Sequence, residues 1–278
     1  MRLAGTLLAL LLGGAAIAGC SDAPRAAQEA AGPAPGPLWH DEFDGPAGAA
    51  PDPENWTAET GGEWGDDELQ QYTDRTENAQ TDGEGHLVIT ADRETYTGYD
   101  GVTRDYTSAR LTTYRKFDFQ YGHVEARMKV PHGKGLVAAF WTLGSDIEEV
   151  GWPECGEFDV VEVVGEKPSI AHGSLHGPGV GEHGWAQTEE FRNEEPLSHD
   201  WHVYAATWTP EYIEFSVDGH VYSRRTPEGL PGGARWTFDR RMHLLLTLSV
   251  GGPWAGAPDE STEWPARLLV DWIRVWPS

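Results

Sequence analysis

Cysteine is scarce in this sequence: the chain of 278 residues contains only two, Cys20 and Cys155. Two cysteines form at most one disulfide, so the sequence excludes a fold held together by several disulfides. A folded unit of this length buries enough apolar surface to be stable without disulfides or metal ions. We expect Cys155 to be a small buried side chain rather than a nucleophile.

Basic residues are also scarce, since 20 lysines and arginines stand against 45 aspartates and glutamates, a net charge of −25. Nucleic acids need a basic surface, so this charge argues strongly against a protein that binds them. The same negative field repels sulfated and other anionic polymers, which leaves a neutral partner as the better fit. We expect the protein to be a monomer.

Long apolar runs are confined to the N-terminus, where Leu3 to Ala18 follow Arg2. This run is too short for an ordinary transmembrane helix, and it predicts the core of a signal peptide over residues 1–19. It ends in Ile17-Ala18-Gly19-Cys20, which resembles the bacterial lipobox. Cys20 would then carry lipid and anchor an exported protein to the outward face of the cell envelope. The alternative is ordinary secretion, with Cys20 incidental.

A helical pattern of apolar residues is missing after the N-terminus. Residues 20–37 are rich in alanine, proline and glycine, and such a segment serves as a disordered tether. From residue 38 on, apolar and polar residues alternate in short runs between turn signals, most clearly over Gly122–Val130. Asp218-Gly219 predicts a hairpin turn. We predict one all-β domain over residues 38–278, an antiparallel β-sandwich of the jelly-roll type. Further strands are expected at 86–91, 108–114, 137–143, 157–163, 202–208, 211–217, 242–250 and 268–275.

The most informative acidic residues lie within Gly156–Glu162. On a regular strand Glu157 and Asp159 share one face, Phe158 lies on the other, and Glu162 points away from the two acids. A β-bulge at one of the two valines before Glu162 would return it to the acidic face, and bulges are common beside active sites. Crowded carboxyl groups raise at least one pKa. Retaining glycosidases need such a pair, one group ionised and the other protonated.

Taken alone, these seven residues also fit a solvent-facing strand in a protein rich in acids. The segments around them, however, resemble glycoside hydrolase family 16 in their order along the chain, and within it the bacterial laminarinases, which are endo-β-1,3-glucanases. The resembling segments are Asp41–Asp44, Trp64–Gln70, Tyr106–Leu111, Tyr121–Arg127, Ala139–Trp141, Trp152–Glu157, His176–Gly179, Val250–Trp254 and Leu269–Val275.

The resemblance implies an enzyme that cleaves internal β-1,3-glucosidic bonds of laminarin-type β-glucan, a neutral polysaccharide, by a retaining double displacement. Glu157 would be the nucleophile and Glu162 the general acid/base, while Asp159 would hydrogen-bond the nucleophile and help set its protonation. The two valines between Asp159 and Glu162 resemble the longer form of the motif, which laminarinases, agarases and carrageenases share. The domain over residues 38–278 would be catalytic, with a concave cleft for the substrate.

The resemblance also implies substrate-binding residues. Trp141 and Trp152 flank the loop before the acidic strand, where family members place tryptophans that stack on sugar rings; core packing is the alternative. Arg110 would bind sugar hydroxyls or form a surface salt bridge. His176 would hydrogen-bond near the acid/base or cap its strand. We expect three other tryptophans to lie in the core: Trp208, Trp272 and Trp276.

No cofactor is expected for catalysis, but the resemblance implies one structural calcium ion. The matching positions are Glu42, Asp271 and a backbone carbonyl near Gly85, and such oxygen ligands suit a calcium ion. The alternative is that the two acids are ordinary residues at strand ends.

Two other functions stay open. A non-catalytic β-glucan-binding protein would resemble the enzymes but lack one or both glutamates, which this chain keeps. A hydrolase of the same family acting on agar-type galactan is compatible with the sequence, whereas a carrageenan site would need more basic residues. Asp66, Asp67 and Pro253 stand where family members often have asparagine, which leaves the subsite preference open.

The lipid anchor gives a first testable prediction. Cys20→Ala removes the side chain that would carry lipid, so a bacterial host should release the protein from its membrane fraction into the soluble fraction. Fractionation of the wild type and the variant, followed by immunoblotting, measures the change. An unchanged distribution would leave Cys20 as an incidental residue behind an ordinary signal peptide.

Overall fold

The computed structural model describes residues 36–278 except 63, 66, 180, 182 and 183. The predicted signal peptide over residues 1–19, Cys20 and nearly all of the predicted tether over residues 20–37 lie outside the described residues. Within the described part, none of the helices has the length and apolar character needed to cross a membrane.

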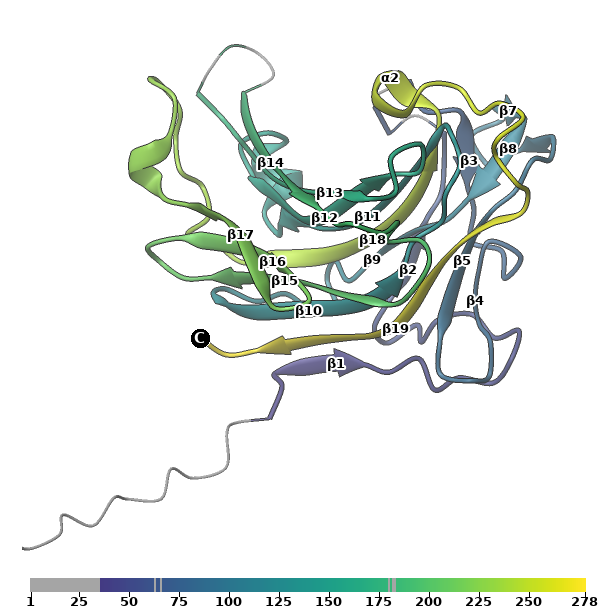
Figure 1. The fold of residues 1–278 in the computed structure, drawn as a ribbon, viewed down its shortest axis with the longest axis horizontal. Helices are drawn as coiled ribbons and strands as arrows, with labels where there is room; N and C mark the ends of the chain where they lie inside the picture. The colour runs from purple at the N-terminus through teal and green to yellow at the C-terminus, as the bar shows by residue number, and fades with distance from the viewer. Residues whose placement is uncertain (1–35, 63, 66, 180, 182–183) are drawn as a thin grey trace, which may run out of the picture. The chain divides into compact units, whose positions relative to one another are not determined.

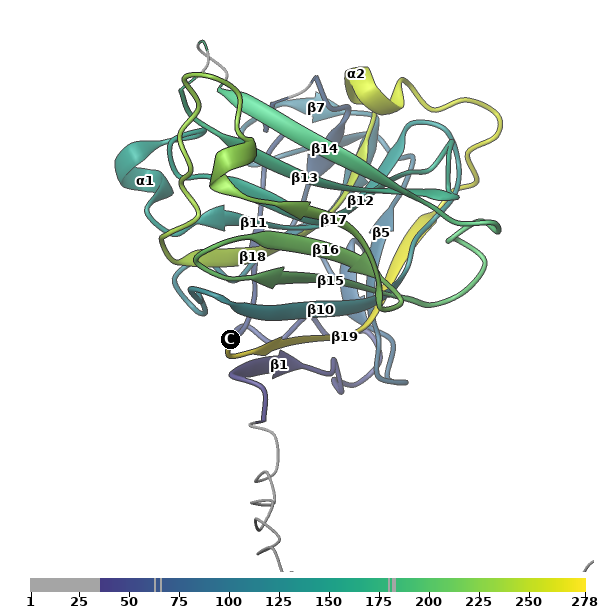
Figure 2. The same cartoon turned by 60° about the vertical axis from the view of Figure 1, so that its left-hand side comes forward.

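Alternating burial along β10 (Gly122–Lys129) shows how the strands divide their side chains between two faces. Val124, Ala126 and Met128 are fully buried, and the polar residues between them are partly exposed. This strand lies within an antiparallel sheet of eight strands, in which β1 (Trp39–Asp41) also pairs with β19. The order of the other seven is β17 (His220–Arg225), β16 (Ile213–Val217), β15 (His202–Trp208), β10, β19 (Ala266–Trp276), β5 (Leu87–Ala91) and β4 (Ala79–Thr81), and Figure 2 shows most of them side by side.

A second antiparallel sheet of seven strands packs against the first (Figure 1), and it curves so that its outer face is concave. Its order is β14 (Trp185–Arg192), β13 (Ile170–Gly177), β12 (Glu157–Val164), β11 (Leu136–Gly144), β18 (Met242–Val250), β9 (Arg110–Thr112) and β2 (Thr57–Glu59). The shorter elements are β3 (Gln70–Tyr72), β6 (Tyr96–Thr97), β7 (Thr103–Arg104), β8 (Tyr106–Ser108), α1 (Ile147–Val150), α2 (Gly252–Ala255) and a 3-10 turn at Pro227–Gly229.

The hydrophobic core lies between the two sheets. Every residue of β18 is buried, and Phe158 of β12 packs with its ring centroid 5.6 Å from that of Trp208 in the opposite sheet. Cys155 is also fully buried and unpaired, and burial raises the pKa of its thiol to about 12, so it is inert as predicted. The inner side of β12 therefore packs into the core, and its outer side carries the polar residues.

The predicted sandwich is confirmed, and most predicted strands lie within one to three residues of their observed bounds. Asp218 and Gly219 both have positive φ, as a two-residue hairpin turn requires, and they join β16 to β17. The expected strand at 108–114 is shorter, since β9 covers only 110–112. Trp208 is buried as expected, but the prediction was wrong for Trp272 and Trp276, which are half-buried.

The reason for this error is an irregularity in β19. Arg127 pairs with Trp272, but the next residue of β10 pairs with Val270, so Asp271 is an extra residue in the ladder. The extra residue changes the alternation, and Trp272 and Trp276 alternate with the buried Ile273 and Val275. Their rings therefore lie on the outer side of the eight-stranded sheet rather than in the core.

Candidate active site

The acidic strand β12 contains the predicted bulge. Against β11, Val161 pairs with Phe140 but Asp159 pairs with Trp141, so Val160 has no partner of its own. Against β13, the register also shifts between Asp159 and Glu162. The extra residue turns Glu162 back to the face that carries Glu157 and Asp159, while both valines stay buried.

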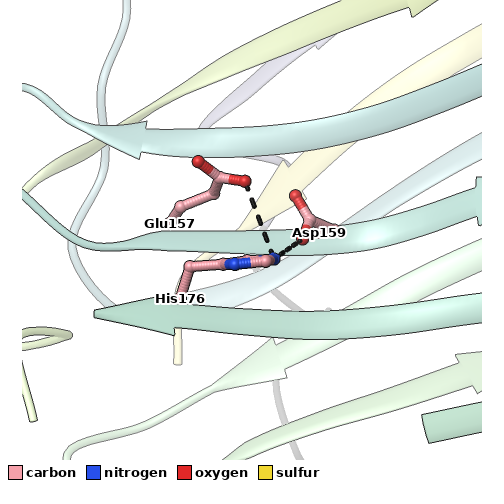
Figure 3. A group of neighbouring side chains, drawn as sticks. All are labelled: Glu157, Asp159 and His176. Atoms are coloured by element: carbon pink, nitrogen blue, oxygen red, sulfur yellow. Dashed lines mark ion pairs between the residues drawn. The ribbon is translucent and has the colours of Figure 1, made fainter. Parts of the chain in front are cut away.

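Glu157, Asp159 and His176 meet on the concave side of the sheet (Figure 3). Nε2 of His176 lies 3.1 Å from Oδ2 of Asp159 and 3.9 Å from Oε1 of Glu157. From the loop before β12, the indole Nε1 of Trp152 donates a hydrogen bond of 2.8 Å to Oε2 of Glu157. Glu157 is therefore contacted by one neutral donor and one imidazole.

Glu162 has a different partner. The hydroxyl of Ser174 in β13 donates to Oε2 of Glu162 over 3.3 Å, and its oxygen also lies 3.0 Å from the hydroxyl oxygen of Thr188 in β14. Ser174 is the register partner of Asp159, and His176 is that of Glu157. The pairing of β12 with β13 thus places a polar side chain beside each acid.

Burial and mutual repulsion govern the protonation of this group. The pKa values of Glu157 and Glu162 are both raised, first by burial and then by the negative charge of Asp159. Burial alone would lower the pKa of His176, but its contact with Asp159 and the charges of the two glutamates raise it to about 10. At neutral pH His176 is therefore a cation among carboxyl groups.

The predicted sugar-stacking tryptophans both lie at this face. Trp152 is exposed over 45% of its surface. Trp141 is partly buried, and its Nε1 donates to the hydroxyl of Thr247 over 3.2 Å. His176 is the last residue but one of β13, and it contacts Glu157 and Asp159 rather than the predicted acid/base.

Arg110 forms the salt bridge that was one of its two predicted roles. Its Nε donates to Oε2 of Glu59 over 2.6 Å. Its guanidinium also lies 4.5 Å from the ring centre of Trp64 and 4.6 Å from that of Trp141. The binding of sugar hydroxyls by Arg110 stays a prediction.

The positions expected to bind calcium are neighbours, but their carboxylates have other partners. A Cβ on Gly85 would lie 4.0 Å from the carbonyl oxygen of Glu42, so these two segments are adjacent. The carboxylate of Glu42 accepts hydrogen bonds of 2.9 and 2.8 Å from Arg274, and that of Asp271 pairs with Arg127. In the described part of the chain, Glu157, Asp159 and His176 are the acids and histidines grouped closely enough to hold a metal ion.

The sequence matches a known family over most of this domain. The model of glycosyl hydrolases family 16 matches residues 67–274. The chain belongs to this family. A β-glucanase of Rhodothermus marinus is 40% identical, with 86% of this chain and 84% of that protein covered. A glucan endo-1,3-beta-glucosidase of Cryptopygus antarcticus is 35% identical, with 86% and 90% covered.

The fold agrees with solved family 16 structures. The laminarinase catalytic domain from Thermotoga maritima superposes with a TM-score of 0.80 at 39% sequence identity, over 87% of this chain and 98% of that one. The jelly-roll sandwich of this chain is therefore the fold of its family 16 neighbours.

Several residues of this family 16 site were not singled out from the sequence. Ser174 lies on β13 two residues before His176, and no motif in the sequence marked it. Trp64 and Trp254 are exposed over 38% and 50% of their surfaces, and the ring of Trp254 lies edge-on to His172 at 4.8 Å. Both tryptophans fall in segments that carry the family resemblance, and this was the available signal; Trp64 lies in a loop and Trp254 in the short helix α2.

The hydrogen bond from Trp152 gives a prediction about pH. An N–H donor favours the ionised form of Glu157, so Trp152→Phe raises the pKa of Glu157. Less of Glu157 is then ionised at a given acidic pH. We expect the acidic limb of the pH–rate profile to move to higher pH by about half to one unit, less than a fully buried charged hydrogen bond would give.

Trp254→Phe is the matched control, because this exposed indole contacts His172 and makes no hydrogen bond to an acid among the described residues. The control should leave the acidic limb in place. An equal shift in both variants, or no shift in Trp152→Phe, would contradict the role of the indole N–H.

Proposed function

We propose that this chain is a retaining endo-β-1,3-glucanase that cleaves internal bonds of laminarin-type β-glucan. The observation that carries the proposal is the bulge in β12, which brings Glu157, Asp159 and Glu162 to one face. The relatives named β-glucanase, glucan endo-1,3-beta-glucosidase and laminarinase support the substrate class. The net charge of −25 also suits a neutral polysaccharide.

The proposed mechanism assigns one proton to the two glutamates. Glu157 is contacted by the indole N–H of Trp152 and by the cationic ring of His176, and both favour its ionised form. Glu162 is contacted by the neutral hydroxyl of Ser174. Because neighbouring buried carboxyl groups resist ionising together, the proton stays on Glu162, and Glu157 is the nucleophile.

The first step forms an ester. The carboxylate of Glu157 attacks the anomeric carbon, and Glu162 gives its proton to the glycosidic oxygen, which leaves as the hydroxyl of the departing chain. In the second step Glu162 takes a proton from water, whose oxygen displaces Glu157 from the anomeric carbon. The net charge of the site stays the same through both steps, because Glu162 becomes ionised as Glu157 loses its charge to the ester, and the reverse happens in the second step.

The site residues also help to distinguish the proposed enzyme from the two alternative functions. A β-glucan-binding protein without activity needs no acid pair, whereas this chain keeps both glutamates, which are partly buried and within electrostatic range of a cationic histidine. No contact in the described residues favours agar-type galactan over β-glucan. Substrate comparison therefore decides between these two polysaccharides.

We also propose a cellular location for the enzyme. An exported, lipid-anchored monomer fits the N-terminal run and Cys20, which lie outside the described residues, and ordinary secretion is the alternative. Polysaccharides do not cross membranes, so an enzyme that degrades them needs an outward-facing location.

A structural calcium ion at Glu42, Gly85 and Asp271 stays a prediction. Carboxylate and carbonyl oxygens suit calcium, but the ion would have to share the acids with Arg274 and Arg127. If it binds, a chelator should lower the melting temperature, because a ligand bound only by the native state stabilises it. An unchanged melting temperature, with no metal found by elemental analysis, would show that Glu42 and Asp271 pair only with the arginines and bind no calcium.

The substrate prediction uses purified protein and four polysaccharides. Laminarin should release the most reducing sugar, with less from lichenan and none above background from agarose or carrageenan. Glu157→Gln, which keeps the shape of the side chain, should lower the rate by several orders of magnitude. Faster release from agarose than from laminarin would sink the substrate assignment, and activity retained in Glu157→Gln would sink the assigned nucleophile.

The stereochemical outcome checks the mechanism independently. Two displacements at the same carbon restore its configuration, so the β-anomer should form first. Proton NMR at early reaction times follows the anomeric signals before they equilibrate. A first-formed α-anomer would show that water attacks directly and that no ester forms on Glu157.

A further inference from the structure

One row of paired residues crosses the concave sheet and ends at the catalytic strand. Glu59 of β2 pairs with Arg110 of β9, and Arg110 pairs with Thr247 of β18. Thr247 then pairs with Ala139 of β11, which pairs with Glu162. Because paired residues lie side by side across a sheet, Glu59 and Arg110 are in line with the acid/base, three to four strands away.

Arg110 is held on three sides within this row. Its guanidinium lies over two indole rings, with Cζ 4.5 Å from the ring centre of Trp64 and 4.6 Å from that of Trp141. Its Nε donates to the carboxylate of Glu59 over 2.6 Å, and only 11% of the Arg110 side chain is exposed. Rotation of the guanidinium is therefore opposed by stacking and by a charged hydrogen bond together.

The edge of the guanidinium that carries the two Nη atoms remains available. Among the described residues no hydrogen bond to these atoms is found, and neither atom is a fully buried donor without a partner. An Nη edge presents several N–H groups in one plane, which suits the hydroxyl groups of a neutral sugar. Burial and Asp159 raise the pKa of Glu157, and the charge of Arg110 is among the influences that oppose this rise, so Arg110 lies within electrostatic range of the site.

Glu59 has no direct access to the reacting groups, yet it decides how Arg110 lies. Its carboxylate neutralises the guanidinium, so the pair adds no net charge beside a neutral polymer. Its bond occupies Nε, so that in the described residues the Nη atoms of Arg110 have no hydrogen-bond partner. Without the carboxylate, a long arginine side chain with several rotatable bonds would adopt other orientations between the two indoles.

We propose that Glu59 is a positioning residue for substrate binding, which fixes Arg110 between Trp64 and Trp141 so that its Nη edge meets the glucan. The inference rests on the proposed β-glucanase activity and adds a residue that acts through Arg110. Its predicted effect is on affinity for the polysaccharide, because Glu59 lies away from the bond that breaks.

The structure offers a matched pair that separates this role from an ordinary salt bridge. Glu214 and Arg224 are register partners on β16 and β17 of the other sheet, and Nε of Arg224 donates to Glu214 over 2.7 Å. The guanidinium of Arg224 also covers an aromatic ring, that of Tyr212, at 4.2 Å. The type of contact is the same as at Glu59, but the pair lies on the other sheet and outside the row that ends at Glu162.

Kinetics of Glu59→Gln, Glu59→Asp and Glu214→Gln on laminarin provide the test. We expect Glu59→Gln to raise KM by about three- to tenfold, as the loss of one ordered polar contact does, with kcat within about twofold of the wild type. Glu59→Asp keeps the charge and should recover part of the loss. Glu214→Gln should leave both constants unchanged, and both glutamine variants should melt within a few degrees of the wild type.

Binding without turnover gives a second measurement. In the Glu157→Gln background, calorimetric titration with a laminarin oligosaccharide of six glucose units should show weaker binding when Glu59→Gln is added. Equal KM and equal affinity in the Glu59 and Glu214 variants would overturn the positioning role, as would a loss confined to kcat. Failure of the wild type to hydrolyse laminarin would instead overturn the proposed function, so the two failures are distinguishable.

Discussion

Three carboxyl groups on one strand repel one another, and burial strengthens this repulsion because little water is present to screen it. In β12 the bulge at Val160 brings Glu162 back beside Glu157 and Asp159, so the strand's own geometry creates the conflict. A retained proton and the cation on His176 resolve it. The rest of the site follows from this balance, since Trp152 and Ser174 each act by favouring one protonation state of a glutamate.

Packing on the opposite side of β12 stabilises the strand enough to offset the repulsion within this polar cluster. Phe158 and the valines of β12 lie in the core, and Phe158 contacts Trp208 of the other sheet. A strand fixed on one face cannot turn to relieve repulsion on the other. Side chains on the concave side therefore keep the positions that catalysis requires, although the repulsion between their charges destabilises the folded protein.

Sequence patterns located the acidic strand well because its signal is local: acids and apolar residues alternate within eight residues, and the bulge follows from the spacing of Glu162. Other parts of the site depend on contacts between distant segments. Glu59 and Arg110 are 51 positions apart, and no local pattern joins them. The bounds of β13 were not predicted, because glycines interrupt the strand. Gly173 is needed there, since a Cβ would lie 2.4 Å from the hydroxyl of Tyr222 and within 3 Å of the ring of Phe215.

The edge strand β14 carries features that prevent a strand of another molecule from pairing with the sheet. Most of its side chains are exposed, and several are charged, including Glu189, Glu190 and Arg192. An uncovered edge with unpaired backbone groups can recruit a strand from another molecule, and charged side chains along it discourage such pairing. Substitutions that remove these charges would therefore favour pairing between molecules at the edge of the sheet that carries the catalytic strand.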